Sequence, residues 1–176
     1  MGNWWSERMN GPATLVGEFT TQEGGDQTIQ GLAFGNGTLY GSDTAGNAVN
    51  STPEGIYTID SSGVTTLVLD LTVNDEEGIY DIGGIAFNPV DGLLYGTNDV
   101  AFTTDLMRGL VAIDIAAQTV TLVAEYPNNE TDIDGLAISD DGIAYLIDDD
   151  NSNPSGGGGL FYSYDLSQGA NGSFNW

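Results

Sequence analysis

The residues best suited to chemistry form a run of oxygen-bearing side chains at positions 148–153, with the sequence Asp-Asp-Asp-Asn-Ser-Asn. Carboxylate and amide oxygens are the ligands that calcium prefers. The alternation of Asp148, Asp150 and Ser152 is similar to the start of a calcium-binding loop, but Pro154 follows and no Glu stands where the bidentate ligand would belong. We therefore expect either a weak calcium site on Asp148, Asp150 and Ser152 or a solvated loop between two strands.

Nucleophilic catalysis finds little support in the composition. The chain contains no His and no Cys, so it lacks the usual base and the thiol nucleophile, and the absence of Lys excludes a Ser–Lys pair. The glycines Gly156–Gly159 are expected between strands and not before a helix, which argues against a phosphate-binding loop. Carboxylate pairs are abundant, and their abundance makes any one pair uninformative. We therefore predict no catalytic residue.

The charge balance limits the partners. Asp and Glu number 26, Lys and Arg only 2, and the formal net charge is −24. Such a surface repels phosphate backbones and anionic lipid headgroups, which argues against nucleic acid and membrane-surface partners. It attracts cations and tolerates salt, because screening relieves the self-repulsion. Two interpretations follow, a cation-binding protein or adaptation to a salty medium, and the second is favoured. No apolar stretch is long enough for a membrane span.

An internal repeat sets the architecture. Four matched motifs recur three times in the same order, at intervals of about 50 residues. The first motif begins at a glycine in each copy, namely Gly31, Gly84 and Gly135. The second motif carries a tyrosine in each copy, namely Tyr40, Tyr95 and Tyr145. The repetition of these tyrosines at one register predicts packing between units and argues against a carbohydrate platform.

Each motif reads as a β-strand. The motifs are short apolar runs without a helical period, and no window predicts a helix of ordinary length. The first and second strands are joined by the turn dipeptides Asn36-Gly37, Asp91-Gly92 and Asp141-Gly142. An aspartate follows the second strand in each copy, namely Asp43, Asp99 and Asp148. Because it recurs in every unit, we interpret this aspartate as a structural residue. One unit is thus a four-stranded antiparallel meander.

Such a meander is the blade of a β-propeller, and stacking around an axis buries its two apolar faces. The pattern GLAF, LYG, IYTID and TLV resembles the repeats of the bacterial propeller superfamily that includes NHL, YVTN and gluconolactonase-like proteins, above all secreted proteins of unassigned function. We predict an all-β chain with a linker at 1–13 and a partial β-propeller at 14–176. Its expected parts are an outer strand at 14–19 and blades at about 28–71, 80–126 and 132–176.

The resemblance implies a place for a functional site. The residue before each leading glycine would enter the central channel, and these residues are Gln30, Gly83 and Asp134. In gluconolactonase-type propellers, acidic and amide residues in the channel hold a divalent metal that polarises a lactone or ester carbonyl. Asp134 is similar to one such ligand. The matching positions hold Gln30 and Gly83, and the sequence offers no clear set of partner ligands. Asp134 is therefore interpreted first as a strand-entry or turn residue.

The two ends of the repeat array are complementary. Residues 14–19 match the fourth strand of a blade that is absent, and the third blade stops where its own fourth strand should begin. Propellers have about four to eight blades, and this chain has three. One interpretation is a piece of a longer propeller, which is favoured because the last blade ends in mid-pattern. The other is a homodimer that closes a six-bladed ring through the outer strands.

We expect a non-enzymatic binding or scaffolding propeller, acidic and stabilised by calcium if by any cofactor. The first alternative is a metal-dependent lactonase or esterase of the gluconolactonase type. The second is a structural section of a larger surface protein. The expected location is extracellular or at the cell surface, although residues 1–12 do not read as a signal peptide, and a high-salt cytoplasm is the alternative. The ligand could be a small molecule or a protein.

Overall fold

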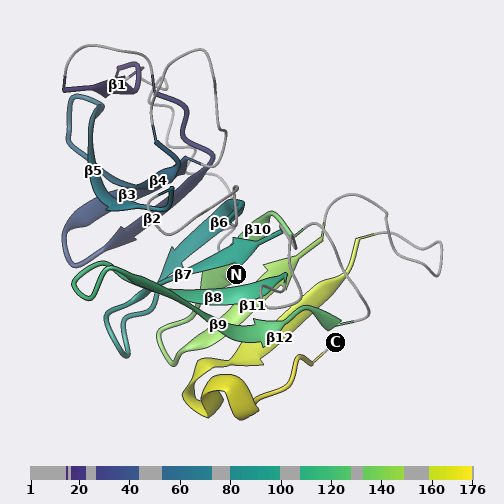
Figure 1. Ribbon diagram of the computed structural model, residues 1–176. Coiled ribbons are helices and arrows are strands. Elements are labelled where there is room, and N and C mark those ends of the chain that lie inside the picture. Colours follow the sequence, from purple (N-terminus) through teal and green to yellow (C-terminus); the bar gives the residue numbers. More distant parts are fainter. Residues whose placement is uncertain are drawn as a thin grey trace, which may run out of the picture.

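The computed structural model of the chain is built almost entirely from antiparallel strands in three sheets (Figure 1). It describes residue 15 and the ranges 17–22, 27–43, 53–72, 80–99, 108–127, 133–148 and 159–175. Apart from one short strand added at the outer edge of the first sheet, each sheet follows the chain order of its strands and is a meander, as the repeat predicts. The prediction of an all-β chain made of propeller blades is confirmed. No described helix is long and apolar enough to cross a membrane.

Blade 1 contains four antiparallel strands and one short addition. Its strands from first to last are β2 (Gly31–Gly35), β3 (Thr38–Asp43), β4 (Gly55–Ile59) and β5 (Val64–Asp70). A fifth strand, β1 (Thr20–Thr21), pairs in parallel with β5 at the outer edge. The sheet therefore has the order β1-β5-β4-β3-β2.

The outer strand predicted at 14–19 lies partly beyond the described residues. Within it, Leu15 and Gly17–Phe19 belong to no strand, and β1 begins directly afterwards. The Thr20 N–H donates to the Gly63 carbonyl, and the Thr65 hydroxyl donates to the Thr20 carbonyl. These bonds hold β1 to the outer edge of blade 1 itself. The linker predicted at 1–13 lies outside the described residues.

Blade 2 is a regular four-stranded meander. Its strands are β6 (Ile82–Phe87), β7 (Leu94–Asn98), β8 (Gly109–Asp114) and β9 (Thr119–Glu125). The register shifts once between β8 and β9, at Leu110 and Val111, and blade 1 has its corresponding shift at Ile56 and Tyr57. A bulge at the same place in both blades indicates that the repeat extends to the backbone irregularities as well as to the side chains.

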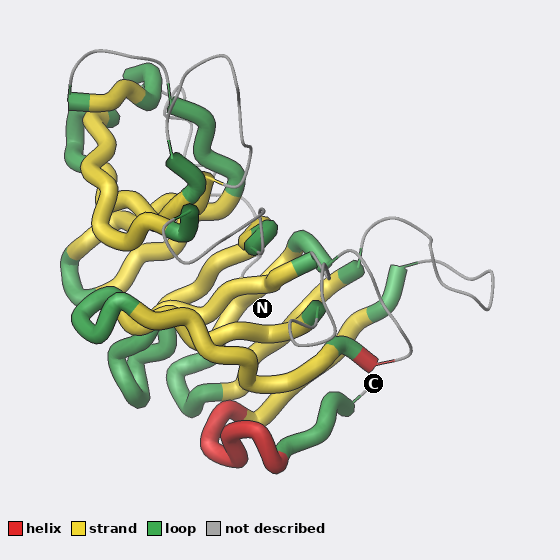
Figure 2. Tube along the Cα trace, in the orientation of Figure 1, coloured by secondary structure: helices red, strands yellow, loops and turns green. Residues whose placement is uncertain are grey.

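Blade 3 has three strands, β10 (Gly135–Ile138), β11 (Ile143–Ile147) and β12 (Phe161–Asp165). After β12 the chain turns through a short 3₁₀ helix, η2 (Leu166–Asn171), which is drawn red in Figure 2. The fourth-strand position holds only an isolated antiparallel bridge between Ser163 and Asn175.

The backbone of the hairpin turn agrees with the conformation that its dipeptide predicts in blade 1, and agrees only in part in blades 2 and 3. Asn36 and Gly37 both have positive φ, at 50° and 79°, as a tight two-residue turn requires. At the two Asp-Gly turns only the glycines, Gly92 and Gly142, have positive φ. The preceding aspartates act as hydrogen-bond acceptors instead: the Asp91 carboxylate accepts from the Leu93 N–H and from the Tyr95 hydroxyl. The sequence therefore located the turns but not their type.

The leading glycines let adjacent inner strands approach closely. A Cβ on Gly31 would lie 2.3 Å from the Gly83 carbonyl oxygen of the next blade, and a Cβ on Gly84 would lie 2.4 Å from the Asp134 carbonyl oxygen. No side chain fits at such distances from a backbone atom. The recurrence of glycine at this position thus has a steric cause, the contact between successive blades.

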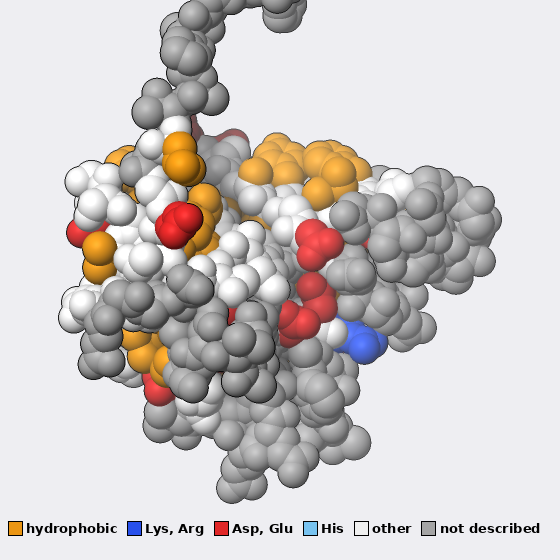
Figure 3. Space-filling view, turned by 90° about the horizontal axis from the view of Figure 1, so that it is seen from above, with side chains coloured by type: hydrophobic (Ala, Val, Ile, Leu, Met, Phe, Trp, Pro, Cys, Tyr) orange, Lys and Arg blue, Asp and Glu red, His pale blue; other side chains and the backbone are white. Residues whose placement is uncertain are grey.

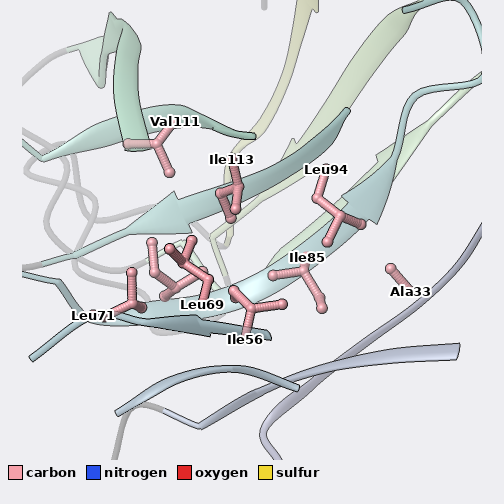
Figure 4. Close-up of a cluster of buried hydrophobic side chains, with 9 residues drawn as sticks. Ala33, Ile56, Leu69, Leu71, Ile85, Leu94, Val111 and Ile113 are labelled. Carbon is pink, nitrogen blue, oxygen red and sulfur yellow. The ribbon is translucent and has the colours of Figure 1, made fainter. Parts of the chain in front are cut away.

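Apolar clusters fill the two spaces between blades. The cluster between blades 1 and 2, shown in Figure 4, contains Ala33, Ile56, Leu69, Leu71, Ile82, Ile85, Leu94, Val111 and Ile113. The cluster between blades 2 and 3 contains Tyr95, Leu110, Tyr126, Ile133, Ala144, Leu146, Tyr162, Tyr164 and Leu166. Burial of this apolar surface is the main force that joins the blades.

Candidate functional site

The inner strands of the three blades meet around one cavity of about 460 Å³. Its lining residues are Gln30, Asp81, Gly83, Asp99 and Asp134. Gln30 stands directly before β2 and Asp134 directly before β10, while Gly83 lies in β6. The structure thus brings together the three residues that the repeat placed at the channel entrance, one from each blade.

Backbone hydrogen bonds position the cavity residues. The Gln30 N–H donates to the Ser42 carbonyl over 2.9 Å, which extends the β2–β3 ladder by one residue. The Asp99 N–H donates to the Asp81 carbonyl over 3.1 Å, and the Asp81 N–H donates to the Asn98 side chain over 2.9 Å. Because these bonds tie the entry of β6 to the end of β7, Asp81 and Asp99 lie side by side at the cavity.

Asp99 also joins two blades. One of its carboxylate oxygens, Oδ1, accepts a hydrogen bond of 3.1 Å from the Ile133 N–H at the entry of blade 3. Its other oxygen, Oδ2, would lie 3.8 Å from a Cβ placed on Gly83, and the Asp134 Oδ1 would lie 3.4 Å from the same point. Because Gly83 has no side chain, little more than open space lies between the carboxylate of Asp99 in blade 2 and that of Asp134 in blade 3. The side chain of Asp99 has both a structural and a cavity-facing role.

The electrostatic environment of the cavity is negative. The described basic residue, Arg108, donates from its Nε to the backbone carbonyl of Asp99 over 2.6 Å. Burial raises the pKa of Tyr126 well above its ordinary range, and the negative charge of Asp99 raises it further. Figure 3 shows several acidic side chains gathered on one face of the molecule. A cation entering this cavity would be attracted by three carboxylates.

The cavity does not form a complete metal cage within one chain. Its donors are carboxylate and amide oxygens, which suit a hard divalent cation. Over the part of the chain that the structure describes, however, no three acidic side chains are grouped closely enough to hold a metal ion together. The residues present therefore do not fit the multi-ligand metal site that the gluconolactonase resemblance implies, and no catalytic step through a metal follows from them.

The calcium-loop residues are only partly described. Asp148 directly follows β11, the second strand of blade 3, and is buried, and its N–H donates to the Leu160 carbonyl over 3.0 Å. Asp150 and Ser152 lie outside the described residues. The calcium site on Asp148, Asp150 and Ser152 accordingly stays a prediction.

Sequence reasoning missed two residues of the cavity, Asp81 and Asp99. Asp81 stands two positions before Gly83, where blade 3 has Asp132 and blade 1 has Thr28, so the acid recurs in two of the three blades. Asp99 was noticed only as one of three recurring aspartates, and recurrence suggested a structural role. The available signal was its position at the end of the second strand, which lies next to the entry of the first strand in an antiparallel pair.

Comparisons with known proteins support the fold and leave the family open. No family model matches the sequence, and no curated protein matches it. Among solved structures, the chain resembles a gluconolactonase of Xanthomonas campestris, with a TM-score of 0.53 and 18% identity over 79% of this chain and 45% of that one. It also resembles the computationally designed Ika4 protein, with a TM-score of 0.50 and 15% identity over 93% of this chain and 78% of that one.

At these identities the likeness concerns the fold alone. The chain has a β-propeller-like fold with a gluconolactonase among its structural neighbours, and it spans less than half of that neighbour's length. What the neighbour does catalytically is a property of that enzyme.

Proposed function

We propose that the chain is a non-enzymatic binding module of the β-propeller type, and that its inner-strand cavity takes a divalent cation, with calcium as the first choice. The observation that supports this most is the convergence of Asp81, Asp99 and Asp134 on one cavity. Oxygen donors favour calcium or magnesium, and the absence of His and Cys from the chain disfavours softer metals. A cation would relieve the repulsion among the three carboxylates.

Affinity is expected to be low. With fewer than three acidic side chains arranged around a single point in the described residues, water would complete the coordination. Sites of this openness bind calcium with dissociation constants of about 10⁻⁴ to 10⁻³ M. Such a site would be filled in a calcium-rich medium and would act as a conditional stabiliser of the contact between blades 2 and 3.

The test is a calorimetric titration of the full chain with calcium chloride at constant ionic strength. Asp134→Asn keeps the shape of the side chain and removes its charge, and it should weaken binding at least tenfold. Asp140→Asn is the matched control, because Asp140 is exposed in a turn of the same blade and does not line the cavity. Absence of a saturable signal, or equal weakening in both variants, would overturn the proposal.

A second candidate is metal-dependent hydrolysis of a lactone or ester. Asp134 lines the cavity, and a gluconolactonase is among the structural neighbours, which are the observations that favour it. The chain's own residues argue against it, because a catalytic metal needs three protein ligands and an open position for water. Turnover of glucono-δ-lactone by the full chain with added divalent metal, lost in Asp134→Asn but kept in Asp140→Asn, would favour the hydrolase over the binding module.

A third candidate is a structural section of a larger surface protein. The apolar side chains exposed on the outer faces of blades 1 and 3 favour it, because such faces are covered inside a complete propeller. This function requires the chain to depend on flanking blades for folding. A cooperative thermal transition of the chain alone would argue against it.

A further inference from the structure

Each blade has two faces, which we name by the neighbour they meet. The leading face of a blade packs against the preceding blade, and the trailing face packs against the following blade. In blade 1 the leading face carries Leu32 and Phe34, which are 52% and 70% exposed. In blade 3 the trailing face carries Tyr145, Ile147 and Phe161. Figure 3 shows hydrophobic side chains left uncovered together at one edge of the molecule.

The strand register shows which residues are equivalent on the trailing faces. Tyr95 pairs with Ala112 in blade 2, and Tyr145 pairs with Ser163 in blade 3, so Phe161 occupies the position of Leu110. Leu110 is completely buried between blades 2 and 3, whereas Phe161 is 61% exposed. The trailing face of blade 3 is thus a surface that the repeat buries wherever a following blade exists.

The leading faces are equivalent in the same way. Leu32 and Phe34 of blade 1 match Ile85 and Phe87 of blade 2. Ile85 is buried in the cluster between blades 1 and 2, and Phe87 packs partly buried against it. The Phe87 ring lies so close to Gly35 that a Cβ there would stand 2.0 Å from it. The leading face of blade 1 and the trailing face of blade 3 are therefore the two halves of one blade-to-blade interface.

We propose that a second copy of this chain covers both faces, so that two copies close a six-bladed ring. In such a pair, Leu32 and Phe34 of each copy pack on Tyr145, Ile147 and Phe161 of the other. The two contacts are identical and related by a twofold axis, so the assembly closes and does not grow into a filament. Six blades fall within the range that closed propellers use.

The outer parts of the two faces also complement each other. On the leading face of blade 1, Tyr57 shares a row with Leu32, and Thr65 lies on the last strand. Both are already buried, and the Gln27 side chain bonds to Thr65 there. Only the inner half of this face is open. The sheet that the structure describes for blade 3 consists of β10, β11 and β12. Its trailing face therefore matches in extent the open inner half of the leading face of blade 1.

The interface between copies would differ from the internal ones at one position. Ser42 in blade 1 donates to the Gly83 carbonyl of the next blade, and the matching Thr97 of blade 2 is also a hydroxyl residue, which accepts from the Gly84 N–H of its own blade. The register places Ile147 at this position in blade 3, beside stacked rings of Tyr145 and Phe161 whose centroids are 5.8 Å apart. The apolar, aromatic surface distinguishes this face from the two internal trailing faces and favours its pairing with Leu32 and Phe34.

Charge opposes this association and gives it a diagnostic salt dependence. Each copy carries a formal net charge of −24, so two copies repel each other at low ionic strength. Salt screens that repulsion and strengthens apolar contacts at the same time. We therefore expect the dimer to tighten as sodium chloride rises from 0.1 to 1 M, which is the reverse of the response of an interface based on ion pairs.

The test is sedimentation velocity on the full chain, with a chelator present so that cation binding plays no part. The expected mass is twice 18.4 kDa. Phe34→Glu and Phe161→Glu should each give a monomer whose melting temperature equals that of the wild type at a concentration low enough to dissociate the dimer, because both side chains are exposed in the single chain. The matched control is Val90→Glu, since Val90 is 64% exposed in a turn of blade 2 away from both faces, and this variant should stay dimeric.

Mixing the two charged variants tests the pairing itself. Phe34→Glu and Phe161→Glu together leave one contact with two native halves, so a mixture should regain part of the dimer that neither variant forms alone. The proposal is overturned by a wild type that stays monomeric at all salt concentrations and melts cooperatively, by dimers that survive both substitutions, or by open chains that lengthen with concentration.

Discussion

Blade 2 and blade 3 have the same repeat and different surroundings. Blade 2 has a neighbour on both faces, and its Leu110 is completely buried. Blade 3 has a neighbour on one face, and Phe161 at the same register position is 61% exposed. Both side chains sit on a third strand with the same pairing. The comparison shows that the repeat determines the strand and the direction of each side chain, whereas burial depends on the next blade.

The largest expected effect tests this difference directly. Leu110→Ala should lower the free energy of unfolding by about 2–5 kcal/mol, because it leaves a cavity between two blades that cannot easily collapse. Phe161→Ala should change the stability of the single chain by less than about 1 kcal/mol, since surface changes rarely cost more. Urea unfolding followed by circular dichroism at low protein concentration measures both values.

If Phe161→Ala proves as costly as Leu110→Ala at every protein concentration, the exposed face of blade 3 is covered within the single chain. A cost that appears only at high concentration would instead report the second copy, because association adds to the apparent stability of the folded state.

A second, smaller effect concerns the leading glycines. Gly84→Ala should cost about 1–3 kcal/mol, because the new methyl group would lie 2.4 Å from the Asp134 carbonyl oxygen and the backbone of blade 3 would have to shift. Gly135→Ala meets the Ile147 Cγ2 instead, and Ile147 is half exposed and free to turn outward. We expect less than half the cost there. Thermal melts of both variants provide the measurement.

The control for this pair is the double variant Gly135→Ala with Ile147→Ser, which removes the contacting methyl group. Its melting temperature should match that of Ile147→Ser alone. A residual loss in the double variant would indicate that Gly135, like Gly84, faces a backbone from another blade.

Much of the fold could be predicted from the sequence, because it depends on local and repeated signals. The glycine, tyrosine and turn positions gave the strand order of each blade, and the position before each leading glycine led to Gln30, Gly83 and Asp134. These signals can be recognised in a single sequence because they recur in every blade.

The features that could not be predicted depend on contacts between residues that do not hold equivalent positions in the repeat. Asp81 aligns with Asp132 of blade 3 but with Thr28 of blade 1, so the repeat does not mark an acid at this position in every blade. The parallel pairing of β1 with β5 is accompanied by long-range contacts of a nearby residue, Gln27. Its side chain contacts Asp43 and Thr65, which lie far along the chain. The type of the two Asp-Gly turns depends on hydrogen bonds to Asp91 and Asp141, which the dipeptides alone do not specify.

A third prediction concerns the covered part of blade 1's leading face. Burial raises the pKa of Tyr57 to about 12, and the negative charge of Asp43 contributes second. Since the ordinary pKa of tyrosine is near 10, the neutral form is favoured by folding, and its contribution is fully present below pH 10 and lost as the pH rises through 12. The wild type should therefore weaken steeply between pH 10 and 12.

Tyr57→Phe should flatten that decline while it lowers stability at neutral pH by about 0.5–1.5 kcal/mol, because the hydroxyl donates to the Pro53 carbonyl. Urea unfolding at a series of alkaline pH values measures the slope. Burial also raises the pKa values of Tyr95 and Tyr126, so part of the decline should remain. An unchanged slope in the variant would mean that this part of the face is open to water.

The smallest effect separates local chemistry from the influence of neighbouring blades. Asp60 directly follows the third strand of blade 1 and Asp165 is the last residue of the third strand of blade 3, although one precedes a fourth strand and the other precedes η2. Hydrogen bonds from the Ser62 side chain lower the pKa of Asp60, and those from the Ser167 side chain lower the pKa of Asp165. Each carboxylate also accepts the backbone N–H of its serine.

Because both folded pKa values are depressed, the contribution of each carboxylate to stability is present above the pKa of the unfolded chain and is lost as the pH falls through the folded value. Ser62→Ala and Ser167→Ala should each raise the pKa of the neighbouring aspartate by a similar amount, as followed by carboxyl carbon NMR. Similar shifts are expected because the largest cause at each aspartate is a serine side chain two residues away, in contrast to the unequal burial of Leu110 and Phe161. A clearly larger change in the pKa of one of the two aspartates would show that neighbouring blades influence even these exposed turns.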